Sequence, residues 1–95
     1  MSHGLKVLKF AAVMEEKLIA NDHKGGWGEC SLDWLLNRLR QETGELAREV
    51  EVLKATLDPK AVERVLREAA DVANFAMMVS DNAQAYLEYM TRGKT

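Results

Sequence analysis

Apolar side chains recur every three or four residues along most of this chain, and only two places break the pattern. Spacings of i, i+3 and i+4 put side chains on one face of an α-helix, whereas a half-buried strand alternates at every second residue. One break is a loop with three glycines in residues 25–28, and the other is the Asp58-Pro59 pair. The pattern therefore predicts one all-α domain, spanning residues 1–95, of three long helices.

The expected helix boundaries follow from residues that favour helix ends. The first helix is expected from about Leu5 to Ile19, ahead of the glycine-rich loop. The second should run to about Ala55 after Ser31, whose hydroxyl suits an N-cap position. The third should start at Asp58-Pro59, an N-cap residue followed by a first-turn proline. A polar run at residues 80–82 leaves open whether this helix is continuous or divides in two.

Three helices in so short a chain cannot cover all the apolar surface that the sequence carries. The segment Val72–Val79 is apolar on nearly every side except at Asn74, so helices should cover it on more than one face. Trp34 and Phe75 are also expected in the core. Further apolar side chains continue toward the C-terminus, at Tyr86, Leu87, Tyr89 and Met90. We therefore expect an antiparallel helical bundle completed by homo-oligomerisation, as a dimer or a tetramer.

Charge and composition exclude several classes of protein. The net charge of −2 gives no basic surface for non-specific binding of nucleic acid. No apolar run approaches the roughly 20 residues of a membrane span, and the first residues lack the apolar stretch of a signal peptide. The lone Cys30 excludes an internal disulfide. These features favour a cytoplasmic protein without a nucleic-acid or membrane partner.

Four carboxylates stand at helical spacing on two neighbouring helices. Glu42 and Glu45 are three residues apart on one flank of the second helix, with Glu42 nearer its apolar stripe. Glu68 and Asp71 repeat the spacing on the third helix, directly before the apolar segment. On adjacent antiparallel helices the four would come within reach of one another. Such a cluster of hard oxygen ligands suits Mg²⁺, with Mn²⁺ as a substitute.

A simpler explanation is that each carboxylate forms an ordinary surface ion pair within its own helix. Pairs of this kind are common and contribute little to stability. The helical spacing offers Arg38 for Glu42, Arg48 for Glu45, Arg64 for Glu68 and Arg67 for Asp71.

The order of these motifs resembles the MazG-like, all-α nucleoside triphosphate pyrophosphohydrolases. Their pattern is E-E-x-x-E, a spacer and E-x-x-D; here it matches Gln41–Leu46 and Glu68–Phe75, with 22 residues between Glu45 and Glu68. Lys24-Gly25-Gly26-Trp27 also resembles a K-x-x-W element found in many members. The chain departs from the family pattern at Gln41, where the family has its first glutamate.

The resemblance implies Mg²⁺-dependent hydrolysis of ribo- or deoxyribonucleoside triphosphates between the α- and β-phosphates, giving a monophosphate and pyrophosphate. Clearing aberrant nucleotides and tuning nucleotide pools are both open as its purpose. The implied metal ligands are Glu42, Glu45, Glu68 and Asp71. Glu42 or Glu45 would be the general base that positions the attacking water.

The resemblance also implies a substrate pocket. Lys24 would contact a phosphate and Trp27 the base or sugar, although a solvated loop lysine and a core tryptophan explain them as well. Asn74 would contact ribose or phosphate, or else hydrogen-bond a neighbouring helix. Helix bundles built across subunits would let a second copy contribute residues near Phe10 and Met14.

A function of another class also fits the helices and the charge. The chain would then be a non-enzymatic interaction module, which dimerises and presents an acidic face to a basic partner. Divalent metal discriminates between the two functions, because only a metal site should show a metal-dependent rise in melting temperature.

Overall fold

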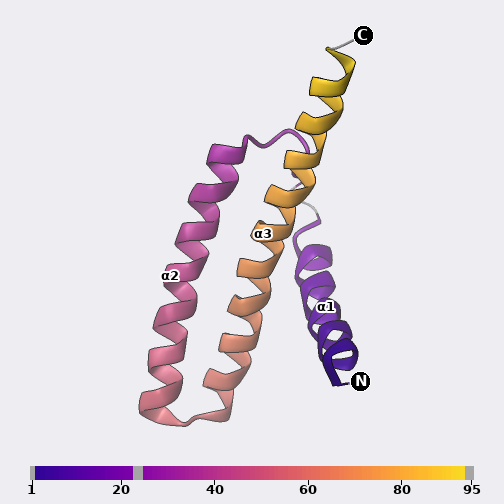
Figure 1. The fold of residues 1–95 in the computed structure, drawn as a ribbon. Helices are drawn as coiled ribbons and strands as arrows, with labels where there is room; N and C mark the ends of the chain where they lie inside the picture. Colours follow the sequence, from indigo (N-terminus) through magenta and orange to yellow (C-terminus); the bar gives the residue numbers. More distant parts are fainter. Residues whose placement is uncertain (1, 23–24, 94–95) are drawn as a thin grey trace.

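The computed structural model describes residues 2–22 and 25–93, which form three α-helices and, over those residues, no strand. The helices are α1 (Ser2–Ala20), α2 (Leu32–Thr56) and α3 (Pro59–Arg92). α2 and α3 lie side by side and run antiparallel, while α1 packs on the other side of α3 (Figure 1). The all-α prediction is therefore confirmed, and the expected boundaries are close to the observed ones.

Both predicted helix starts are capped as the sequence indicates. The Ser31 hydroxyl accepts a hydrogen bond from the Trp34 amide at 3.1 Å, and the Asp58 carboxylate accepts one from the Lys60 amide at 2.9 Å. α2 ends at Thr56, one residue beyond the predicted Ala55, but the turn that ends it was not predicted. There Leu57 adopts a left-handed conformation, with φ of 52°, and donates its amide to the Leu53 carbonyl at 2.8 Å. This single turn lets the chain reverse directly into α3.

The polar run at residues 80–82 does not interrupt α3, which settles the alternative that the sequence left open. Its side chains hold the glycine-rich loop instead. The Trp27 indole Nε1 donates to Asp81 Oδ2 at 2.8 Å. The Asn82 amide donates to the carbonyls of Trp27 and Cys30, each at 2.9 Å. Asp81 and Asn82 thus serve tertiary contacts with the loop.

The core within one chain is small. α3 packs against both other helices, but the prediction that they bury Val72–Val79 is met only in part: within this segment only Asn74 is buried, and Ala76 is exposed. Among the described residues, however, the fully buried apolar side chains are only Leu35, Ala61 and Ala70. The expectation that Trp34 lies in the core is wrong, since 51% of it is exposed. Phe75 is half-buried, with the Arg38 guanidinium 5.2 Å from its ring centroid.

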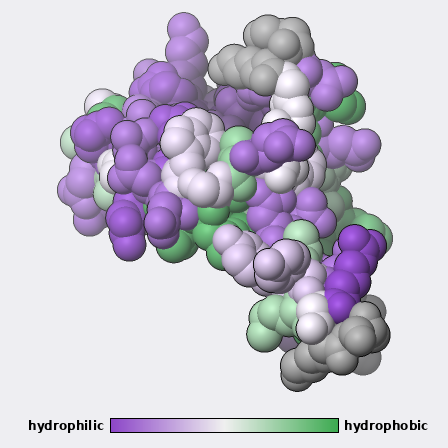
Figure 2. All heavy atoms as spheres, turned by 90° about the horizontal axis from the view of Figure 1, so that it is seen from above, coloured by the Kyte–Doolittle hydropathy of each residue, from purple (hydrophilic) through white to green (hydrophobic). Residues whose placement is uncertain are grey.

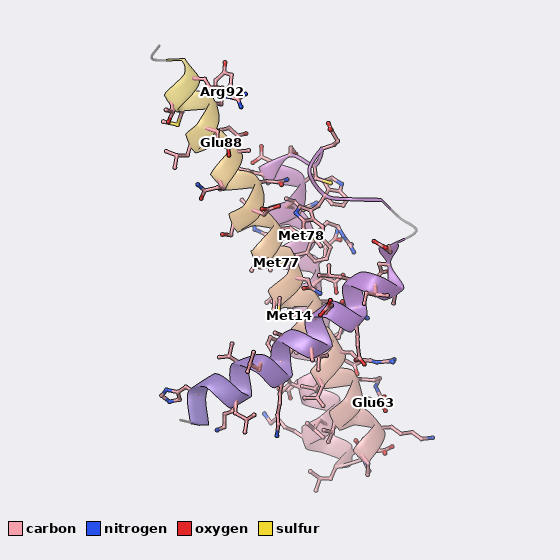
Figure 3. All side chains as sticks on the ribbon, turned by 90° about the vertical axis from the view of Figure 1, so that its right-hand side faces the viewer. Met14, Glu63, Met77, Met78, Glu88 and Arg92 are labelled. Atoms are coloured by element: carbon pink, nitrogen blue, oxygen red, sulfur yellow. The ribbon has the colours of Figure 1, made fainter. Side chains whose placement is uncertain are left out.

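α1 crosses α3 near Met14, as Figure 3 shows. The half-buried residues of α1 include Val13, Met14 and Lys17, whereas Leu5 and Leu8, three residues apart on another face, are exposed. α1 therefore has two apolar faces, of which one is open to solvent.

The molecule is elongated and open. It measures 58 × 33 × 23 Å and has a radius of gyration of 16.2 Å, against about 12 Å for a compact domain of this length. The C-terminal part of α3 extends beyond the start of α2 (Figure 1), and hydrophobic side chains are exposed between hydrophilic ones on the surface (Figure 2). Among the described helices, none combines the length and the apolarity that a bilayer crossing requires.

Candidate metal centre and adjoining cavity

Three carboxylates converge where α2 and α3 face each other. Glu42 comes from α2, Glu68 and Asp71 come from α3, and one oxygen of each lies within 4.8 Å of the others. We call these three residues the acidic triad. The antiparallel pairing explains the convergence, because it sets the motif of one helix beside the motif of the other. Three of the four carboxylates predicted as ligands are thus brought together.

Glu45 lies at the margin of the acidic triad rather than within it. Its hydrogen bond and its charge both act on Glu42, so the two carboxylates are neighbours. Among the described residues, the group whose oxygens meet within 4.8 Å does not include it. Gln41 is exposed, and its side-chain oxygen accepts a hydrogen bond at 2.5 Å from Arg38, the same guanidinium that pairs with Glu42.

The surroundings of the triad disfavour the charged form of its carboxylates. Burial raises the pKa of Glu42 to about 7, and hydrogen bonds and charge from Glu68 and Glu45 act in the same direction. Burial also raises the pKa of Glu68, against the lowering effect of its hydrogen bond with Glu42 and of the charge of Lys17. Carboxylates crowded in this way are stabilised by a nearby cation.

The cations beside the triad differ from those that helical spacing offers. Arg38 pairs with Glu42 at 3.0 Å, as expected. Asp71, however, pairs with Lys17 of α1 at 3.3 Å. Within residues 2–22 and 25–93 neither Arg64 nor Arg67 pairs with a triad carboxylate. Lys17 is a neighbour that the sequence did not indicate, because 54 positions separate it from Asp71 and no local spacing links them.

Two buried oxygens in this region have no hydrogen-bond partner. One is Glu68 Oε2 and the other is Asn74 Oδ1. Asn74 is only 4% exposed, and its amide nitrogen donates to the Met14 carbonyl at 3.0 Å. The helix-to-helix hydrogen bond predicted as one alternative for Asn74 is therefore present, and the side-chain oxygen of Asn74 has no partner. Unpartnered buried oxygens are costly, so both favour a ligand with a donor or a positive charge.

The chemistry of the triad fits a divalent cation. Its oxygens are the hard ligands that Mg²⁺ and Mn²⁺ prefer, and one of its residues, Glu68, has a buried oxygen without a hydrogen-bond partner. Because the pKa of Glu42 is about 7, a cation would bind more tightly as the pH rises through neutrality.

A cavity of about 440 Å³ adjoins the triad and includes Asp71 and Asn74 in its wall. Its other walls come from the end of α1, the loop, the start of α2 and the middle of α3. They are mostly apolar and aromatic, and they include Leu18, Ile19, Trp27, Cys30, Trp34, Phe75 and Met78. A cavity of this size and lining suits a small flat ligand such as a nucleobase.

The predicted substrate-binding residues have three different outcomes. Asn74 lines the cavity, and its side-chain oxygen has no hydrogen-bond partner. Trp27 also lines it, but the hydrogen bond from its indole goes to Asp81. Lys24 lies outside the described residues. Trp34 and Cys30 belong to the cavity although the sequence did not indicate them, because their role depends on how the loop folds back.

Comparison with protein-family models, with curated proteins and with solved structures finds no match to this chain.

Proposed function

We propose that this protein is a metal-dependent nucleoside triphosphate pyrophosphohydrolase. One observation carries the proposal: Asp71 belongs to the acidic triad and also lines the 440 Å³ cavity, which we call the aromatic cavity. A nucleotide with its base in the cavity would extend its phosphates toward the triad. The unpartnered oxygens of Glu68 and Asn74 and the motif resemblance support the same function.

In this reaction a water oxygen bonds to the α-phosphorus, and the bond from that phosphorus to the bridging oxygen breaks. The electron pair leaves with pyrophosphate, and the water's proton passes to Glu42 or Glu45. Glu42, Glu68 and Asp71 would hold Mg²⁺ or Mn²⁺. When bound, the cation neutralises phosphate charge and lowers the pKa of water. The purpose we propose is housekeeping of the cytoplasmic nucleotide pool.

The test is a panel of ribo- and deoxyribonucleoside triphosphates, incubated with Mg²⁺ or Mn²⁺. We expect a monophosphate and pyrophosphate in equal amounts. Asp71→Asn and Glu45→Gln should abolish turnover and keep the helical signal, whereas Glu51→Gln, at an exposed position of α2, should match the unaltered protein. A diphosphate and single phosphate as products would contradict the cleavage site.

We further propose that the protein acts as a homo-oligomer. The small core, the large radius of gyration and the open apolar face of α1 support this assembly. Exposed apolar residues also continue along the end of α3, at Tyr86, Leu87, Tyr89 and Met90. These faces equally favour the second candidate function, a non-enzymatic helical interaction module. That candidate gains if no nucleotide is cleaved and metal leaves the melting temperature unchanged.

A further inference from the structure

A second hollow lies beside the acidic triad, in the groove between α1 and α3. It has a volume of about 480 Å³, and its lining residues are Val13, Glu16, Lys17, Ile19, Ala20 and Arg67. Lys17 also lines the aromatic cavity, and its ammonium lies 3.3 Å from Asp71. Lys17 therefore lies at the junction of the cavity, the triad and this groove.

Arg67 gives the groove a second positive charge. It lies one helical turn before Asp71 on α3 and on the same face, so helical spacing would pair the two. Asp71 is instead paired with Lys17, and over the described residues Arg67 is exposed and forms no ion pair. The groove is thus lined by two cations and one carboxylate, that of Glu16. A positive site borders the three carboxylates of the triad.

We propose that this groove, between Lys17 and Arg67, binds the diphosphate group of a phosphoanhydride, as free pyrophosphate or as the terminal phosphates of a nucleotide. The proposal rests on the proposed function, in which that group forms at the neighbouring triad. A guanidinium offers forked donors to two phosphate oxygens, and an ammonium adds a compact positive charge. The cations offset the repulsion between the departing anion and the carboxylates.

The geometry also indicates how a nucleotide would be oriented along α3. The aromatic cavity and the groove both border Lys17, and Asp71 lies beside it. A base in the cavity, an α-phosphate at the triad and a diphosphate in the groove would follow one continuous path along α3. Lys17 would contact the diphosphate close to the bond that breaks, and Arg67 would hold its far end.

The test measures binding of inorganic pyrophosphate by calorimetry, at a fixed excess of Mg²⁺ and without nucleotide. We expect Arg67→Gln to weaken pyrophosphate binding at least tenfold. Arg40→Gln is the matched control, because Arg40 is also an exposed arginine without an ion pair in the described part of the chain, and it lies on α2 outside the groove. Arg40→Gln should bind pyrophosphate like the unaltered protein. Circular dichroism verifies that both variants remain helical.

Inorganic phosphate and a nucleoside monophosphate complete the comparison. Both should bind more weakly than pyrophosphate, and Arg67→Gln should change their affinity less than threefold. Equal losses of all three anions would overturn the proposal, since they would indicate only general attraction by charge. No pyrophosphate binding by the unaltered protein, or equal binding by Arg67→Gln, would overturn it as well.

Failure of this proposal is distinguishable from failure of the proposed function. Pyrophosphate affinity is measured without turnover, so a groove that binds pyrophosphate through Arg67 stands even if no nucleotide is cleaved. Conversely, if nucleotides are cleaved to pyrophosphate while Arg67→Gln leaves pyrophosphate affinity unchanged, the function stands and the groove does not.

Discussion

At the scale of single residues, Glu42 makes the stability of the fold depend on pH. Its pKa is raised to about 7 from 4.5, so between these values the folded state binds more protons than the unfolded state. The stabilisation from Glu42 is complete below pH 4.5 and is lost as the pH rises through 7. One pKa unit corresponds to about 1.4 kcal/mol.

We therefore predict that, without metal, unfolding by urea takes on the order of 2 kcal/mol less free energy at pH 8 than at pH 5. Glu42→Gln should remove most of this difference, because an amide does not titrate. Glu51→Gln, which changes an exposed carboxylate of the same helix, should preserve it. A pH dependence that is the same in both variants would place the titrating group elsewhere.

Lys17 is the second residue whose charge bears on the triad. Its ammonium lies 3.3 Å from an oxygen of Asp71, where it opposes a divalent cation. We predict that Lys17→Met tightens Mn²⁺ binding on the order of tenfold, or about 1.4 kcal/mol. Electron paramagnetic resonance of free Mn²⁺ measures the affinity. Lys9→Met, on the exposed side of α1, should leave it unchanged, and weaker binding by Lys17→Met would show that the lysine assists the cation.

At the scale of helices, the features that depend only on nearby residues in the sequence were predicted correctly. Ser31 and Asp58 cap α2 and α3 as expected, since capping depends on hydrogen bonds within two or three residues. The run at residues 80–82 was ambiguous because its partners, Trp27 and Cys30, lie more than 50 positions earlier. The ion pair of Lys17 with Asp71 joins different helices in the same way. Only the folded chain brings such groups together.

The turn between α2 and α3 carries backbone strain that can be relieved. Leu57 has φ of 52°, a left-handed conformation that is unfavourable for a residue with a β-carbon. Its side chain is 80% exposed, so packing offsets little of this cost. Glycine adopts this conformation without steric cost and is the usual residue there. We predict that Leu57→Gly raises the free energy of unfolding by about 0.5–1 kcal/mol in urea titrations. Leu57→Ala, which keeps the β-carbon, should give no such gain.

At the scale of the whole molecule, the sequence predicted more apolar surface than three helices can bury, and the fold agrees. Leu35 is the one large side chain among the described residues that is fully buried. Which face of α1 packs on α3 was not predictable, because the sequence carries apolar residues on two faces of this helix. In the structure, the face with Val13 and Met14 packs on α3. Leu5 and Leu8 remain exposed, at 58% and 70%. A pattern of apolar residues identifies a helix but does not select which of two faces packs inside the chain.

The open face of α1 leads to the last prediction. Covering exposed leucines contributes about 25 cal/mol per Å², so a second copy packed on this face would stabilise both chains. We predict that sedimentation at low micromolar concentration gives a dimer or tetramer of the 10.7 kDa chain. Leu8→Glu should dissociate it and lower its melting temperature, because a charge would enter the interface. Lys9→Glu introduces a glutamate at the neighbouring exposed position without removing an apolar side chain, and it should leave the assembly intact. A well-folded monomer of the unaltered protein, with a cooperative melt that is independent of concentration, would show that the small core suffices by itself.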